Sequence, residues 1–397
     1  MVRAVSTSDT PVTTLSQVIA VLEQLYDPAW ARDWDAVGLV CGDPQAPIRR
    51  VLFAVDPTQA VVEEALAWRA DLLITHHPLL MRPVHGVPAT EAKGRVVHSL
   101  IRGGCALFTA HTNADAAAPG VSDALARVLG LIDLVPLAAD PADAVDKIVT
   151  FVPEESVDAV VDALAAAGAG AIGEYARCAW TAAGSGTYVA GAQARPTVGE
   201  ASLRQDVAER RVEMVAPRST RRHVLSALRG AHPYEEPAVD VYELATWSGS
   251  RGIGRVGHLS TATTLRDFAM VVAEALPSSA QGVRVAGEPG AEIRTVAVCG
   301  GSGDSLLDAA RRAKVDAYVT ADLRHHPTSE AREAAQDGPP YLVDVAHWAS
   351  EWPWLAGAAN RLQGRLDAAG SPIEVHVSTK STDGWTFRIP SPTGVVR

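Results

Sequence analysis

The sequence predicts an α/β fold in which both ends of the chain build one domain and the middle forms an inserted α+β domain. Short apolar runs alternate with amphipathic helices in the first third of the chain, and the same alternation returns in the last third. Between these parts the order of elements changes to that of a ferredoxin-like unit. Continuous apolar strands separated by helices are typical of a parallel sheet, which we expect in the domain built from the two ends.

The first third of the chain begins with a helix over 15–25, where apolar residues recur three and four positions apart. Three apolar runs then predict strands, and two amphipathic stretches between them predict helices. The strands are expected at 51–55, 71–75 and 106–110, and the helices at 58–68 and 91–101. We therefore assign 11–140 to the first half of the α/β domain.

The last third repeats this rhythm and is expected to complete the same domain over 252–397. Its strands are expected at 295–298, 317–320, 341–345, 373–377 and 385–389, and its helices at 305–313, 329–335 and 354–366. Since strands and helices again alternate, we expect one α/β domain built from both ends of the chain.

The middle of the chain reads strand, helix, strand, strand, helix, strand over about 147–244. That order is the split ferredoxin-like unit. A compact unit whose ends can lie close together is easily inserted into another domain. We assign 145–246 to this insert, and the Gly- and Ser-bearing run 247–259 to the linker that returns to the first domain.

Composition excludes several classes of protein. The 397 residues are 47% apolar and carry a formal net charge of −11, which argues against a nucleic-acid partner. The four cysteines are too far apart for a C-x-x-C site, so we expect reduced thiols and a cytoplasmic location. The chain shows neither a run of apolar residues long enough to span a membrane nor the apolar region of a signal peptide.

Candidate ligands follow the predicted strands. His76 and His77 come directly after the strand 71–75, and Pro78 opposes a helical continuation. Adjacent residues on an extended segment point in opposite directions, so the two histidines can serve two ions side by side. Taken alone, such a pair is more often one histidine at the strand end and one in solvent.

Two further segments supply polar residues at strand ends. Asp115 lies in HTNAD, after the strand 106–110, and its carboxylate can neutralise cations or simply cap a helix. His111 in the same segment is a candidate for orienting other ligands. His347 and Glu351 are four apart after the strand 341–345, so on a helix they share one face. Ligands bind beyond the carboxyl ends of parallel strands, which makes the convergence of the three segments the decisive observation.

The motifs THHP, HTNAD and DVAHWASE, in this order, resemble those of the Nif-three-like family, also described as GTP cyclohydrolase type 2 homologues. Other segments of both halves agree, among them DWDAVGLVCGD, RGIGRVGHL and DAYVTADLRHH. The middle region is similar to the PII-like or CutA-like insert of longer bacterial members, with AHPYEEPAVDVYEL as its most recognisable stretch. The resemblance covers nearly the whole chain.

The resemblance implies a dinuclear metal site with one histidine of the pair on each ion. The residues that carry over as metal ligands are His76, His77, Asp115, His347 and Glu351. Nitrogen and carboxylate ligands suit Zn, Fe, Mn, Co or Ni, and the ligand types do not choose among them. The family also implies a ring-shaped homo-hexamer.

Two classes of function stay open. The first is a metal-dependent hydrolase of the GTP cyclohydrolase type 2 kind, acting on a nucleotide or another phosphorylated small molecule, because two such cations can activate water and polarise an electrophile. The second is a non-catalytic metal-handling or regulatory protein.

For the hydrolase, Glu351 is a candidate catalytic residue, and Asp322, His325 and His326 are candidates for proton transfer or base contact, or form only a polar turn. The glycines of CGGSGDS, 299–305, could offer backbone N–H groups to a phosphate or simply form a tight turn.

Overall fold

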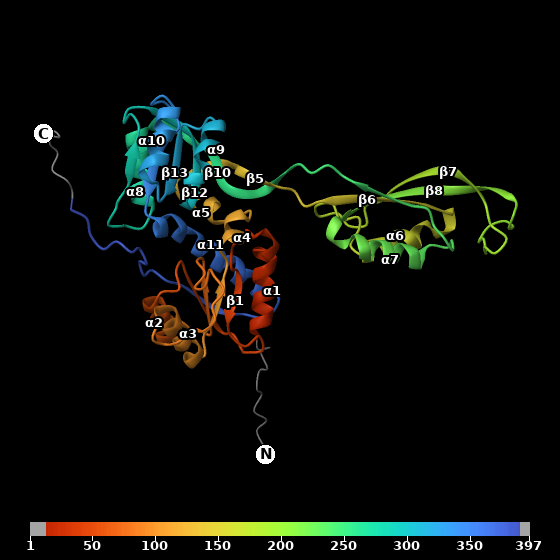
Figure 1. Cartoon of the computed structure of the whole chain (residues 1–397), viewed down its shortest axis with the longest axis horizontal. Coiled ribbons are helices and arrows are strands. Elements are labelled where there is room, and N and C mark those ends of the chain that lie inside the picture. The colour runs from red at the N-terminus through yellow and green to blue at the C-terminus, as the bar shows by residue number, and fades with distance from the viewer. Residues whose placement is uncertain (1–12, 390–397) are drawn as a thin grey trace, which may run out of the picture. The chain divides into compact units, whose positions relative to one another are not determined.

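The structure is a computed structural model that describes residues 13–389. These residues form two compact units. Unit 1 combines 13–140 with 250–389, and unit 2 spans Pro141–Gly249. In Figure 1 the red N-terminal and blue C-terminal segments lie together in unit 1, so this unit is built from both ends of the chain.

The first sheet of unit 1 has five strands in the order β1-β4-β3-β2-β15. These are β1 (Gly38–Cys41), β2 (Arg50–Ala54), β3 (Leu72–Thr75), β4 (Ala106–Thr109) and β15 (Glu374–Val377). All neighbouring strands run parallel except β1, which is antiparallel to β4. Helices α2 (Gln59–Ala67) and α3 (Ala92–Gly103) share one apolar core with the side chains of one face of this sheet.

The second sheet of unit 1 has six strands in the order β11-β14-β13-β12-β10-β5. These are β5 (Leu131–Pro141), β10 (Ser248–Thr264), β11 (Arg284–Ala286), β12 (Glu292–Ser302), β13 (Ala317–Ala321) and β14 (Tyr341–Val345). The three central strands β12, β13 and β14 are parallel, and β10 and β11 pair with them antiparallel. Two helices follow strands of this sheet, α9 (Leu307–Arg312) and α10 (His325–Ala334).

The inner faces of the two sheets share one core with the helices between them. These helices are α1 (Leu15–Leu25), α4 (Thr112–Ala116), α5 (Val121–Val128), α8 (Leu265–Ala275) and α11 (His347–Ala368). Trp354 of α11 is fully buried and donates a hydrogen bond from Nε1 to the Tyr26 hydroxyl. Figure 1 shows α11 between the two sheets, which places its first turn at the carboxyl end of β14.

Unit 2 is a four-stranded antiparallel sheet in the order β7-β8-β6-β9, with both of its helices packed on one face. Its elements are β6 (Val145–Val152), α6 (Val157–Ala166), β7 (Trp180–Val189), β8 (Arg204–Pro217), α7 (Arg221–Ala231) and β9 (Val239–Glu243). The predicted order of strand, helix, two strands, helix and strand is confirmed, and with it the ferredoxin-like character of the insert.

Three expectations about unit 1 are corrected. The parallel strands belong to two sheets with antiparallel edges, not to one parallel sheet. The segment 247–259 is no linker but lies mostly in β10, where glycine allows close approach to β5: a Cβ on Gly252 would come within 2.2 Å of the Ala138 carbonyl oxygen. Residues 385–389 form no strand, and the side chains of Trp385, Phe387 and Ile389 are exposed.

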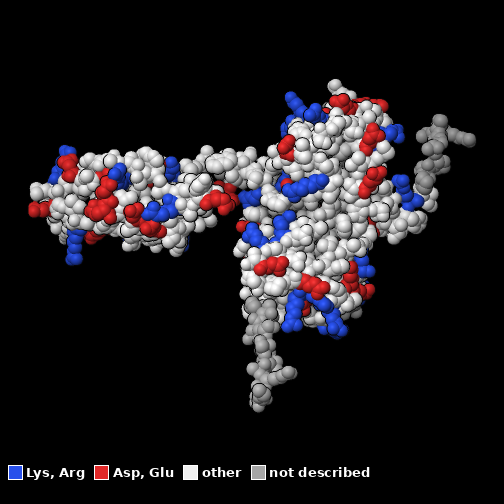
Figure 2. Space-filling model, turned by 180° about the vertical axis from the view of Figure 1, so that it is seen from behind, with Lys and Arg blue, Asp and Glu red and all other residues white. Residues whose placement is uncertain are grey.

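The surface of the described residues mixes both signs of charge. Acidic and basic side chains are interspersed over much of the face shown in Figure 2. Within 13–389, the structure contains no helix that combines the length and the apolar character needed to cross a bilayer.

Candidate metal centre

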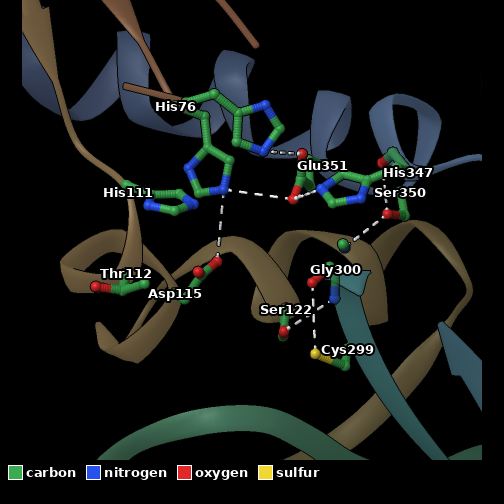
Figure 3. A network of polar contacts seen from close by, with 12 residues as sticks. His76, His111, Thr112, Asp115, Ser122, Cys299, Gly300, His347, Ser350 and Glu351 are labelled. Atoms are coloured by element: carbon green, nitrogen blue, oxygen red, sulfur yellow. Dashed lines mark hydrogen bonds and ion pairs between the residues drawn. The ribbon is translucent and has the colours of Figure 1, made fainter. Parts of the chain in front are cut away.

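Histidine and carboxylate side chains from both sheets of unit 1 converge on one place. His76 and His77 follow β3, and His111 and Asp115 lie at and within α4, which follows β4. His347 is the first residue of α11 after β14, and Glu351 lies one turn later on the same helix. Figure 3 shows the side chains of His76, His111, Asp115, His347 and Glu351 turned toward a common centre. The three predicted segments are therefore neighbours in space, but they come from two sheets and not from one.

The Glu351 carboxylate occupies the middle of this cluster. Its Oε1 lies 2.9 Å from Nε2 of His347 and 3.5 Å from Nε2 of His76. Its Oε2 lies 3.2 Å from Nε2 of His77. Asp115 Oδ1 lies 3.7 Å from His76 Nε2. Because the two oxygens of Glu351 face different imidazoles, this carboxylate can bridge two cations.

Each imidazole is held from behind through Nδ1. His76 Nδ1 lies 2.9 Å from the Ala110 carbonyl oxygen, which can only accept, so this Nδ1 donates a proton. The other three face carboxylates: His77 Nδ1 lies 2.7 Å from Asp56, His111 Nδ1 lies 2.8 Å from Asp35, and His347 Nδ1 lies 2.7 Å from Asp322. An Nδ1 proton held in this way leaves Nε2 of a neutral imidazole as the free lone pair. All four rings thus present a ligand atom to the centre.

His111 has the geometry of a ligand and not only of an outer residue. One ring nitrogen of His111 and one each of His76 and His77 all lie within 4.8 Å of one another. His77, His347 and Glu351 form a second group whose ligand atoms lie within the same distance. The motif HTNAD predicts an orienting role for His111, because the sequence alone does not show where the ring points. In the structure Asp35 Oδ1 lies 2.8 Å from Nδ1 of His111 and so orients this ring.

The ionisable side chains of the cluster are buried, so their charges have to be balanced by their neighbours. The side chains of His76 and Glu351 are 1% and 4% exposed. Burial alone would raise the pKa of the Glu351 carboxyl, but the neighbouring imidazoles hold it well below its usual range. Burial is the largest single effect and lowers the pKa of His77 and His347, but attraction to Glu351 together with the hydrogen bonds to Asp56 and Asp322 outweighs it and raises these pKa values to about 11 and about 10. The buried carboxylates are therefore stabilised by nearby positive charge, which protonated imidazoles or bound cations can supply.

Several buried atoms of the cluster contact only other members of the cluster and, within the described part of the chain, have no hydrogen-bond partner outside it. They are Nε2 of His76, Nε2 of His347 and Oε2 of Glu351. A buried polar atom without a partner costs free energy, about 1–3 kcal/mol for a neutral group and more for a charged one. Nitrogen and oxygen atoms of this kind are ligands for divalent transition metals, so the residues fit a metal centre.

The glycine-rich run 299–305 makes room for Glu351. Gly301 has φ +71°, and a Cβ there would lie 2.4 Å from Glu351 Oε1 and 3.0 Å from His347 Nε2. The Gly301 N–H donates to Ser350 Oγ at 2.8 Å, and the Gly300 N–H donates to Ser122 Oγ. Since both amides are taken by serine hydroxyls, the geometry favours the tight turn over the phosphate loop.

The three candidates for proton transfer or base contact do not lie together in the structure. Asp322 touches the cluster through His347, and its left-handed backbone (φ +58°) turns the chain directly after β13. His325 and His326 lie in the first turn of α10, with ring centroids 5.1 Å from each other. Within the described residues, neither has a recorded contact with His347 or Glu351. Of the three, only Asp322 reaches the cluster.

Asp35 and Asp56 are the supporting residues that the sequence analysis did not single out. Asp35 also accepts hydrogen bonds from the backbone and hydroxyl of Thr112. Burial would raise the pKa of Asp35, but the hydrogen bonds from His111 and Thr112 hold it well below its usual range. Asp56 could have been predicted by the same pattern as the ligands, because it is a polar residue just past the end of a buried strand, β2.

The chain matches known proteins over nearly its whole length. In sequence it is 50% identical over 378 residues to a Mycobacterium bovis protein named GTP cyclohydrolase 1 type 2 homolog, which covers 94% of this chain and 97% of that protein. A Bacillus subtilis protein of the same name is 34% identical over 94% of this chain and 98% of its own.

Solved structures agree with these relatives. A Bacillus cereus protein related to NIF3 has a TM-score of 0.79 and 35% identity, covering 95% of this chain and all of that one. A Staphylococcus aureus protein has a TM-score of 0.80 and 28% identity, with 95% and 99% coverage. The family model described as Duf34/NIF3 (NGG1p interacting factor 3) matches residues 13–384, and the chain therefore belongs to this family.

Proposed function

We propose that unit 1 binds two divalent metal ions through His76, His77, Asp115, His347 and Glu351, with His111 as a sixth ligand. The observation that carries the proposal is the position of Glu351, a buried carboxylate whose Oε1 faces His76 and His347 while its Oε2 faces His77. The orphaned buried atoms of the cluster and the space left by Gly301 support it.

We propose further that the centre serves a metal-dependent hydrolase acting on a nucleotide or another phosphorylated small molecule. The name of the relatives, GTP cyclohydrolase 1 type 2 homolog, supports this substrate class. When bound, two such ions supply activation of water and polarisation of an electrophile. The substrate has access to the cluster from the side of His77 and His347, whose side chains are 21% and 33% exposed, whereas His76 is closed off.

The protein's own residues have separate parts in this proposal. Glu351 balances the charge of the ions, because the neighbouring imidazoles hold its pKa well below its usual range and keep the buried carboxylate ionised. Asp35, Asp56 and Asp322 hold the imidazoles in one tautomer, which keeps Nε2 aimed at the centre. We assign His325 and His326 no role in the reaction.

The alternative is a non-catalytic metal-handling or regulatory protein built on the same centre. The high burial of Glu351 and His76 favours this alternative, because ions enclosed by protein ligands leave little room for a substrate. The homo-hexamer expected from the family resemblance is compatible with both functions. Light scattering coupled to gel filtration tests this oligomeric state.

Elemental analysis and turnover together separate the two functions. We would compare wild type with Glu351→Gln, which keeps the shape of the side chain and removes its charge, and with Glu333→Gln on the exposed side of α10 as the matched control. The hydrolase predicts about two ions per chain and turnover of GTP or a related phosphorylated metabolite, both lost in Glu351→Gln alone. Two ions without turnover of any compound would favour metal handling, and a folded, reconstituted wild type without ions would refute the metal centre.

A further inference from the structure

Unit 2 contains a pocket of its own on the face of its sheet that the helices leave open. Ile148, Val212 and Met214 pack against α6 and α7 on one face. Phe151 and Arg211, which face each other across β6 and β8, alternate with those residues and point to the opposite side. The pocket on that side has a volume of about 650 Å³. This is within the range of small-molecule sites, which is about 300–1,000 Å³.

Two tethered loops close the pocket over the hairpin of β7 and β8. The Arg195 backbone N–H donates to Glu235 Oε2 at 3.0 Å, and the Thr197 hydroxyl donates to the Pro233 carbonyl oxygen at 2.6 Å. Both loops line the pocket. Because hydrogen bonds fix one loop to the other, the pocket exists before a ligand arrives, which lowers the entropy cost of binding.

The lining combines a flat floor with aromatic walls. Strand β7 contributes Gly184 and Gly186 to the floor, and Phe151, Tyr188 and Tyr234 stand around it. A Cβ on Gly184 would have no atom of the described chain within 4 Å, so the space above this glycine is open. A floor without side chains between aromatic rings accommodates a flat apolar body.

The charge of the lining is acidic. Three carboxylates face the pocket, from Glu209, Glu235 and Glu236, against the guanidinium groups of Arg195 and Arg211. The Arg211 guanidinium is already engaged, since its Nε donates to Glu213 Oε1 at 2.8 Å. The surplus of carboxylates therefore favours a cationic ligand.

Glu209 offers one carboxylate oxygen to a ligand. Its Oε1 accepts a hydrogen bond from the Tyr234 hydroxyl at 2.8 Å. Burial and the neighbouring Glu209 raise the pKa of Tyr234, so the hydroxyl keeps its proton and remains the donor. Glu209 Oε2 lies 2.1 Å from the place that a Cβ on Gly186 would take, and no hydrogen bond to it is recorded among the described residues. Glycine thus makes room for an acceptor that faces the floor of the pocket.

We infer that this pocket binds a small organic amine with an aromatic body, whose ammonium group donates to Glu209 Oε2 while its ring lies over Gly184 between the aromatic walls. An ammonium group gains from both partners, because carboxylates accept charge-assisted hydrogen bonds and aromatic faces attract cations. The site is complete within unit 2 and uses no residue of the histidine cluster.

Calorimetric titration of the full-length protein with three ligands of one shape tests the charge preference. The ligands are 2-phenylethylamine, 2-phenylethanol and phenylacetate, and tryptamine extends the ring. We expect saturable binding of the amines at millimolar or lower concentration, about tenfold weaker binding of the alcohol and still weaker binding of the acid. Alcohol binding as tight as amine binding, or no amine binding at millimolar concentration, would overturn the inference.

Three variants locate the ligand. Gly184→Val fills open space in a strand, where a β-branched residue is tolerated, and should abolish amine binding while the protein stays folded. Thr181→Val on the same strand, outside the pocket lining, is the control and should bind as wild type does. Glu209→Gln should remove the preference for amine over alcohol.

Amine binding that survives Gly184→Val would place the ligand elsewhere and overturn the inference. So would a Gly184→Val protein that changes its association state while no amine binds to wild type, because the open face would then be a contact between copies of the chain.

Discussion

The substitution Gly301→Ala, compared with Gly104→Ala, distinguishes the effect of backbone strain on stability from the effect of a clash with Glu351 on ion binding. Gly301 has φ +71°, and Gly104 at the end of α3 has φ +69°. Alanine in this left-handed conformation costs about 1–2 kcal/mol at either position. The two sites differ in their surroundings: a Cβ on Gly104 meets no atom within 4 Å, whereas one on Gly301 lies 2.4 Å from Glu351 Oε1. Gly104→Ala is therefore a matched control for strain alone.

The steric conflict at Gly301 gives the expected magnitude. Ordinary contact begins at 3.4 Å, so the Glu351 carboxylate has to withdraw by about 1 Å. A carboxylate displaced by this amount no longer reaches both ligand groups, and we expect ion affinity to fall by at least about tenfold, or about 1.4 kcal/mol. Gly104→Ala should lose the same stability from strain and keep wild-type ion affinity.

Competition with a chelator measures the ion affinity of the two variants, and urea unfolding of the metal-free proteins measures their stability. The result expected is two proteins destabilised through strain, of which only Gly301→Ala binds ions weakly. If Gly301→Ala held both ions as tightly as Gly104→Ala, the assignment of Glu351 to the centre of the site would be refuted.

Three further outcomes are expected. Asp322→Asn should weaken ion binding about 10- to 100-fold because His347 loses the carboxylate on Nδ1, whereas His326→Ala should bind as wild type; equal losses in a chelator titration would contradict the separation of these residues. The pKa of Asp146 is lowered by hydrogen bonds from Arg221 and Arg218 despite burial, so unit 2 is stabilised above the ordinary pKa of about 4 and loses this stability as pH falls below it. Asp146→Asn should flatten that pH dependence in urea unfolding at a cost of about 1–2 kcal/mol at neutral pH, and an unchanged slope would exclude the mechanism. Removal of ions by a chelator should lower the melting temperature of unit 1 and leave that of unit 2 unchanged, as calorimetry can resolve.

The sequence predicted individual elements more reliably than their pairing. The apolar runs that became β2, β3, β4, β13 and β14 are continuous because both faces of these strands are buried in apolar cores that include helices. Alternation of strands and helices says nothing about which strands are neighbours, and for that reason one sheet was expected where two exist. The run 385–389 has the apolar alternation of a strand but, in the described structure, no partner strand. The strand β10 was not predicted because its glycines are typical of a linker. In the structure these glycines let β10 approach β5 closely.

The candidate ligands could be predicted from the sequence because each lies in the segment that directly follows a strand, either just after the strand or in the first helix that follows it. Their supporting carboxylates follow the same rule once strand neighbours are known. Ala54 of β2 pairs with Thr75 of β3, and Asp56 and His77 each come two residues later.

The second sheet repeats this arrangement. Ala321 of β13 pairs with Val345 of β14, and Asp322 and His347 follow at one and two residues. Parallel neighbours with matched ends therefore bring an aspartate behind a histidine in both sheets.

Asp35 and His111 are also brought together by strand register, but between the antiparallel strands β1 and β4. Gly38 of β1 pairs with Thr109 of β4, so the residues before β1 lie beside the residues after β4. Asp35 precedes that pair by three residues, and His111 follows it by two. The residue pairs that orient the imidazoles are thus set by strand register, and a pattern of residue types along the chain cannot reveal them until the strand order is known. The same dependence implies that a one-residue register slip in β1 would separate Asp35 from His111 without altering any ligand.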